Sequence, residues 1–94
     1  MSERSGEERK RAVAIKYDHK PNQAPVVVAK GQGLVADQIL AAAKQYAVPV
    51  YQNKTLAGML MAVEIDSQIP PELYQAVAEV LSYVYRLDKS KQRR

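Results

Sequence analysis

The strongest constraint on the fold is the run Ala24-Pro25-Val26-Val27-Val28-Ala29-Lys30-Gly31. Three consecutive valines lie between a proline and a glycine, and β-branched residues lose side-chain freedom in a helix but pack well on a pleated sheet. Because the valines do not alternate with polar residues, a strand here is expected to be covered on both faces. The run therefore predicts a buried, central strand.

A second strand is predicted immediately before this run. Over residues 12–17, Val13, Ile15 and Tyr17 alternate with smaller or polar residues, which is the period of two that is typical of a strand. The loop at 18–23 contains a proline and an asparagine and is short enough to return the chain antiparallel. The two strands are therefore expected to pair.

Helices and one further strand are predicted after the central run. Residues 48–52 (Val-Pro-Val-Tyr-Gln) predict a third strand, and the order strand, helix, strand predicts a right-handed parallel crossover. The expected fold is an α/β domain with a small mixed three-stranded sheet in the order β-β-α-β-α-α, packed with three helices. Apolar spacing predicts the helices at about 34–46, at about 56–63 with Asn53 or Thr55 as its N-cap, and at 71–87 with Pro71 in its first turn.

The last predicted helix carries more apolar surface than a small sheet can cover. One stripe along it is formed by Leu73, Val77, Val80, Leu81 and Val84. Tyr74, Ala78, Leu81 and Tyr85 widen the apolar surface around the helix. Part of this surface is therefore expected to bind a partner.

Composition predicts one small domain with charged ends. The 94 residues carry a formal net charge of +4 and no cysteine. Residues 12–87 contain six basic and six acidic residues, so the excess lies in a polar, flexible N-terminal tail at 1–11 and a basic C-terminal tail at 88–94. Neither a signal peptide nor an apolar run long enough to span a bilayer is found, so a cytoplasmic protein is expected.

The charged tails leave two further interpretations open. The six tyrosines together with the basic tails are compatible with a small RNA-binding protein. The basic C-terminal tail is also compatible with peripheral association with an anionic membrane. A body without net charge is poorly suited to reading a nucleic-acid groove, so RNA binding is the alternative rather than the main interpretation.

No catalytic set, metal site or cofactor site is predicted. Gly31-Gln32-Gly33-Leu34-Val35-Ala36 fits the spacing of a dinucleotide-binding turn, but the next predicted strand does not end in the acidic residue that would hold a ribose, so it is interpreted as a structural turn. His19 is the single histidine and is interpreted as a solvated loop residue. Four acids are interpreted as helix surface and caps: Glu64, Asp66, Glu72 and Glu79.

The order and spacing of several segments resemble one known family. The segments are Ala12-Val13-Ala14-Ile15-Lys16-Tyr17-Asp18, the central run, Val48-Pro49-Val50, and Ile69-Pro70-Pro71-Glu72-Leu73-Tyr74-Gln75-Ala76-Val77-Ala78-Glu79-Val80-Leu81. Over roughly residues 12–87 they resemble the cytoplasmic C-terminal domain of the FlhB/YscU family, the export-switch proteins of bacterial flagellar and type III secretion systems. The chain departs from the family where Lys54-Thr55-Leu56-Ala57-Gly58 replaces the frequent Pro-Pro-Leu-Ala-Arg.

The resemblance implies a non-catalytic protein. Family members carry a membrane part and cleave themselves at Asn-Pro-Thr-His just before the first strand of this region. The corresponding positions here are Glu7, Glu8, Arg9 and Lys10, so autocleavage is not expected. The chain resembles the C-terminal fragment left after cleavage, and is expected to be a stand-alone homologue that lacks the membrane part.

The resemblance also implies a docking surface for other proteins. Family domains present a small apolar patch to export substrates, formed by an Ala-Pro before the central strand and by an alanine and a leucine on the last helix. The matching partner-binding residues here are Ala24, Pro25, Ala78 and Leu81. The expected partners are export substrates or export-apparatus proteins, in the cytoplasm or peripherally at the export gate of the inner membrane.

Overall fold

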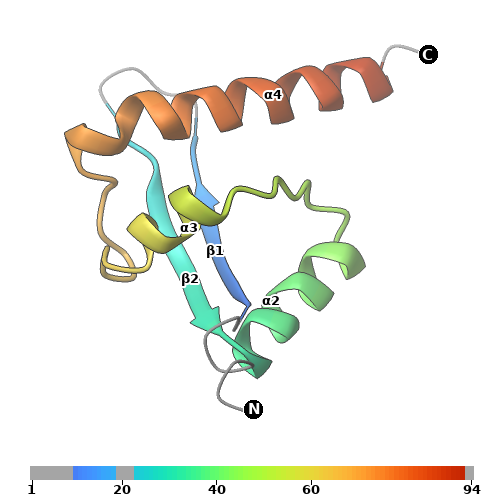
Figure 1. Cartoon of the computed structure of the whole chain (residues 1–94). Coiled ribbons are helices and arrows are strands. Elements are labelled where there is room, and N and C mark those ends of the chain that lie inside the picture. The colour runs from blue at the N-terminus through green and yellow to red at the C-terminus, as the bar shows by residue number, and fades with distance from the viewer. Residues whose placement is uncertain (1–9, 19–22, 93–94) are drawn as a thin grey trace.

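The structure is a computed structural model that describes residues 10–18 and 23–92, with side chains up to residue 86 (Figure 1). The first two strands pair antiparallel as predicted, with Arg11 opposite Gln32 and Lys16 opposite Val26. In chain order the elements are β1 (Arg11–Lys16), β2 (Val26–Gln32), α2 (Leu34–Gln45), α3 (Lys54–Leu60), the 3-10 helix η1 (Pro71–Leu73) and α4 (Tyr74–Gln92).

The predicted third strand is wrong, and with it the three-stranded sheet and the parallel crossover. Within the described residues the sheet contains only β1 and β2, and residues 48–53 are irregular and exposed. In Figure 1 this segment leaves the end of α2 and runs back to the start of α3 without lying beside a strand. Strand propensity describes a side chain's fit to a sheet, and without a neighbouring strand it cannot supply the ladder hydrogen bonds.

The start of β2 is flanked on its second edge by residues 66–69 instead. The Asp66 amide donates to the Val27 carbonyl at 2.7 Å, the Val27 amide donates to Ser67 at 3.1 Å, and the Ile69 amide donates to Pro25 at 2.8 Å. These bonds place the start of β2 between β1 and an extended segment. The central position predicted for this run is confirmed at that end, although a different neighbour provides it.

The expected cover on both faces of β2 is wrong. Val27 is completely buried, whereas 41% of Val28 is exposed, and successive residues of a strand point to opposite faces. One face therefore lies against the core and the other is open. The core consists of Val27, Leu56, Leu60, Val63, Ile69 and Val77, with half-buried apolar residues of β1 and α4 packed against it.

The helix ends follow from local chemistry. The Asn53 side chain caps α3 by accepting a hydrogen bond from the Leu56 amide at 3.0 Å, so the first of the two predicted caps is confirmed. The last helix ends at Gln92, five residues beyond the predicted end at Leu87, because residues 88–92 contain neither glycine nor proline to stop it. None of the described helices combines the length and apolar character that crossing a bilayer requires.

The backbone geometry of the turn between β2 and α2 accounts for the two glycines found there, Gly31 and Gly33. A Cβ on Gly31 would overlap the Val35 side chain, and Gly33 has φ 57° and ψ −123°, a conformation that favours glycine. The Gly33 amide donates to the Lys10 carbonyl at 2.9 Å, and its carbonyl accepts from the Asp37 amide at 3.1 Å. These contacts give a structural reason for both glycines in the Gly-x-Gly pattern.

Candidate docking surface

The predicted partner-binding residues lie around one end of the core. Pro25 is two residues before the buried Val27, and Ala78 and Leu81 follow the buried Val77 on α4. Val27 and Val77 belong to the same core cluster, so the start of β2 and the first half of α4 meet there. Ala24, Pro25 and Leu81 are half-buried, and Ala78 is exposed.

The extra apolar surface predicted on α4 is present and exposed. Tyr74, Ala78, Leu81 and Tyr85 are spaced by four, three and four residues, so they follow one line along the helix. Leu81 packs partly against the core, whereas Tyr74, Ala78 and Tyr85 are exposed. We call these four residues the α4 flank. An apolar strip of this kind beside a polar helix face marks a surface suited to binding another protein.

Ala24 lines a shallow pocket on the open face of β2. The pocket has a volume of about 320 Å³. Ala24, Val26 and Val28, which alternate along the chain, line it together with Asp66 and Gln68. Lys16, Asp18 and Gln23 complete the lining. Its lining combines apolar side chains with groups of both charges, which suits a small side chain of a partner better than a charged ligand.

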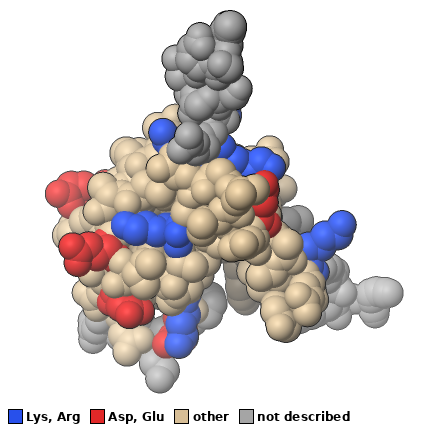
Figure 2. Space-filling model, turned by 90° about the horizontal axis from the view of Figure 1, so that it is seen from below, with Lys and Arg blue, Asp and Glu red and all other residues tan. Residues whose placement is uncertain are grey.

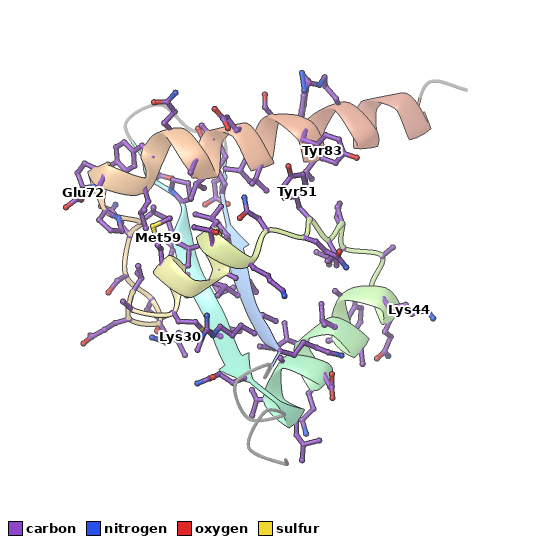
Figure 3. All side chains as sticks on the ribbon, in the orientation of Figure 1. Lys30, Lys44, Tyr51, Met59, Glu72 and Tyr83 are labelled. Carbon is purple, nitrogen blue, oxygen red and sulfur yellow. The ribbon has the colours of Figure 1, made fainter. Side chains whose placement is uncertain are left out.

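The acids considered as candidate catalytic groups lie on the surface. Glu64, Asp66, Glu72 and Glu79 are all exposed. Figure 3 shows Glu72, which lies in the first turn of η1 just before α4, where its negative charge complements the positive N-terminal end of the helical turns. Over the described part of the chain, no three His, Cys, Asp or Glu side chains come close enough together to hold a metal ion. His19 and positions 7–9 lie outside the described residues.

The tyrosines lie on more than one surface of the molecule, and their spacing in the sequence does not show which surface each one occupies. Tyr83 lies on the opposite side of the α4 core stripe from the α4 flank and forms an edge-to-face pair with Tyr51, with ring centroids 5.1 Å apart (Figure 3). This pair attaches the irregular segment 48–53 to α4. On the face shown in Figure 2, basic and acidic groups lie interspersed rather than in one continuous basic area.

Comparison with known proteins places this geometry in a family. A sequence profile described as the FlhB HrpN YscU SpaS family matches residues 9–84. The chain belongs to this family. The resemblance found in the sequence is thereby confirmed. An uncharacterised protein of Bacillus subtilis, YlqH, is 43% identical over 81 residues, which cover 86% of this chain and 87% of that protein.

Longer members of the family match over only part of their length. The flagellar biosynthetic protein FlhB of Aquifex aeolicus is 46% identical over 74 residues, which cover 78% of this chain and 21% of that protein. The chain therefore spans about a fifth of the length of this FlhB.

Solved structures of the family share the fold. The cytoplasmic domain of FlhB from Shewanella putrefaciens superposes with a TM-score of 0.81 and 38% identity, covering 87% of this chain and 68% of that one. The PscU C-terminal domain superposes with a TM-score of 0.75 and 32% identity, covering 80% of this chain and 96% of that one. The described fold is therefore that of the family's C-terminal cytoplasmic domain.

Proposed function

We propose that this chain is a non-catalytic component or modulator of the bacterial flagellar or type III protein export apparatus. In this role it binds export substrates or apparatus proteins and substitutes for the cleaved C-terminal fragment of the switch protein. The observation that carries the proposal is the combination of the FlhB cytoplasmic fold with the exposed α4 flank. It acts in the cytoplasm or peripherally at the membrane-embedded apparatus.

Docking is proposed at Ala24, Pro25, Ala78 and Leu81. Pro25 offers a rigid apolar ring without an amide donor, and its carbonyl is already occupied by the Ile69 amide at 2.8 Å. Ala78 is a small side chain that lets a partner approach α4 closely, and Tyr74 and Tyr85 extend the apolar area on either side. The binding energy comes from apolar contact, so the affinity should change little with salt.

No chemical step is assigned to the chain. The Asn-Pro-Thr-His sequence at which family members cleave themselves is replaced by Glu7-Glu8-Arg9-Lys10. Asparagine cyclisation requires the asparagine side chain, and these positions do not supply one. A purified sample is therefore expected to keep its full mass on prolonged incubation, which mass spectrometry can follow.

The docking surface is tested by charge insertion with a matched control. Ala78→Arg places a cation within the α4 flank, whereas Gln75→Arg places the same cation on the exposed polar face of α4. Both sites are exposed, so both variants should fold. Affinity capture from the native cell, at low and at high salt, should retain identified export proteins with the parent chain and with Gln75→Arg, but not with Ala78→Arg.

Two outcomes would contradict parts of the proposal. Equal retention of export proteins by both variants excludes the α4 flank as the docking surface. Retention of nucleic acid at low salt only, irrespective of residue 78, favours the RNA-binding alternative. Pro25→Asp and Leu81→Arg extend the test to the other half-buried positions, with circular dichroism to confirm that each variant is folded.

The substitution role is tested in a cell. A full-length relative truncated ahead of the region matched by this chain should lose export, and expression of this chain in trans should restore it. Complementation by Gln75→Arg but not by Ala78→Arg would connect the activity to the α4 flank. A folded, expressed chain that fails to restore export excludes substitution.

A further inference from the structure

Residues 46–51 form a continuous run of exposed apolar side chains. Their sequence is Tyr-Ala-Val-Pro-Val-Tyr, and every residue from 44 to 55 is exposed. The exposed fraction is 71% for Tyr46, 54% for Val48 and 53% for Val50. A folded chain normally avoids a run of exposed apolar residues, because it promotes association, unless the run has a binding role. The run therefore indicates a binding surface.

Contacts at both ends hold this run in position. At its start, the Val48 amide donates to the Ala43 carbonyl at 2.8 Å and fixes the turn at the end of α2. At its end, Tyr51 packs edge-to-face against Tyr83 (Figure 3). Both rings remain exposed, so Tyr83 continues the apolar surface onto α4. We call residues 46–51 together with Tyr83 the tyrosine patch. A surface that is already ordered loses little conformational freedom when it binds.

The charges beside the tyrosine patch are mainly positive. Lys44 lies two residues before the run and Lys54 three residues after it, both are exposed, and no acid lies between them in the chain. Figure 3 shows Lys44 at the end of α2 from which the run leaves. On α4, Glu79 and Arg86 lie about one turn before and one turn after Tyr83, so their charges offset each other. The two lysines therefore set the sign of the charge around the patch.

We propose that the tyrosine patch binds a segment of another protein that combines apolar side chains with acidic ones. The apolar side chains of this segment cover the exposed valines and tyrosines, and its acids pair with Lys44 and Lys54. Tyrosine suits such a surface because it supplies a large contact area at a low cost in side-chain entropy. The patch is separate from the α4 flank, so the chain engages partners through two different surfaces, and this proposal does not rest on the export role.

Three other occupants of the tyrosine patch fit its chemistry less well. The acidic residues of the segment 1–9 are accompanied by no hydrophobic residue besides Met1, so that segment cannot cover the apolar run. Two copies that met through the patch would bring their lysines together, and like charges repel. Nucleic acid stacks its bases on flat rings, which the exposed Val48 and Val50 do not offer. The chemistry therefore favours an acidic, apolar polypeptide.

Selection from random peptides tests the chemistry of the partner. Short peptides displayed on phage are selected on the immobilised full chain, and the selected sequences are then synthesised. Peptides that bind the tyrosine patch should combine large apolar residues with an excess of Asp and Glu. Because the chain contains no tryptophan, the fluorescence of a single tryptophan added to a peptide reports its binding without background from the protein.

Variants of the full chain locate the binding surface. Val50→Asp should weaken peptide binding about tenfold or more, because it places a negative charge within the apolar run. Leu34→Asp is the matched control at the other end of α2, where 79% of the leucine is exposed, and it should leave binding unchanged. Lys44→Glu combined with Lys54→Glu should weaken binding about fivefold, since each exposed ion pair contributes little. Circular dichroism checks that each variant is folded, and amide NMR should place the shifts in the tyrosine patch.

Several results would overturn the proposal. Failure to select any peptide whose binding depends on residue 50 excludes the tyrosine patch, and selected peptides without an acidic excess exclude the assigned chemistry. A dimer in sedimentation that Val50→Asp dissociates identifies a second copy as the occupant, and single-stranded RNA that displaces the peptides identifies nucleic acid. Ala78→Arg should leave peptide binding unchanged, so failure of the tyrosine patch and failure of the α4 flank are distinguishable.

Discussion

Ala47 adopts a conformation that its side chain disfavours, and replacing it with glycine should stabilise the protein. Its φ is 57°, in the left-handed region. The Val48 amide donates to the Ala43 carbonyl at 2.8 Å and the Ala47 amide to the Lys44 carbonyl at 3.3 Å, which together form a Schellman motif at the end of α2. Glycine is the usual residue at this position because it lacks the Cβ that crowds the backbone.

The expected change in the free energy of unfolding for Ala47→Gly is the sum of two opposing contributions. Removing the left-handed penalty of alanine gains roughly 1–2 kcal/mol. The greater freedom of glycine in the unfolded chain costs roughly 0.4–1 kcal/mol. The net expectation for Ala47→Gly is stabilisation by about 0.7 kcal/mol, or a rise in Tm of about 3–6 °C for a chain of this size.

The same substitution inside α2 should have the opposite sign. Ala41 is exposed in the interior of the helix, where glycine costs about 1 kcal/mol relative to alanine. Urea unfolding and thermal melts of Ala47→Gly and Ala41→Gly, measured side by side, give the comparison. If both variants are destabilised by similar amounts, the left-handed conformation assigned to Ala47 is refuted, and with it the path of residues 48–51 away from β1.

Three further predictions concern contacts that shape the same region. Gly31→Ala should lower the free energy of unfolding by about 1–3 kcal/mol because its Cβ would overlap Val35, and adding Val35→Ala should recover part of the loss in urea titrations. Lys30→Met should cost about 1–2 kcal/mol in the same measurement, since the ammonium donates at 2.8 and 2.7 Å to two backbone carbonyls just after α3. A double-mutant cycle between Tyr51→Ala and Tyr83→Ala should give a coupling of about 0.5–1.5 kcal/mol, and a coupling near zero would show that segment 48–53 is not attached to α4 through this pair.

Local signals in the sequence determined most of the elements. The alternation around Val13 and the valine run gave both strands, and the short loop between them gave their antiparallel pairing. The apolar periods predict the three helices, and Asn53 is one of the two residues that the sequence predicts as the N-cap of α3. These features depend on residues close together in the chain, which is why pattern reasoning reaches them. The predicted end of α4 is too early because charge alone does not end a helix, and residues 88–92 continue it.

Contacts between residues far apart in the chain could not be predicted from local patterns. Nothing in residues 66–69 marks them as the neighbour of β2, since their role comes from backbone bonds to Val27 and Pro25 rather than from strand-like side chains. Only part of the candidate docking surface could be predicted from the sequence, for a related reason. The line from Tyr74 to Tyr85 follows from helical spacing, whereas the roles of Ala24 and Pro25 came from family resemblance and remain a proposal.

The absence of the strand predicted at residues 48–52 shows what a strand requires besides its composition. Val48, Val50 and Tyr51 favour a strand by composition, yet a strand is stable only when a neighbour satisfies its backbone and covers its side chains. In the described part of the chain residues 48–52 have no such neighbour, because the sheet there contains only β1 and β2.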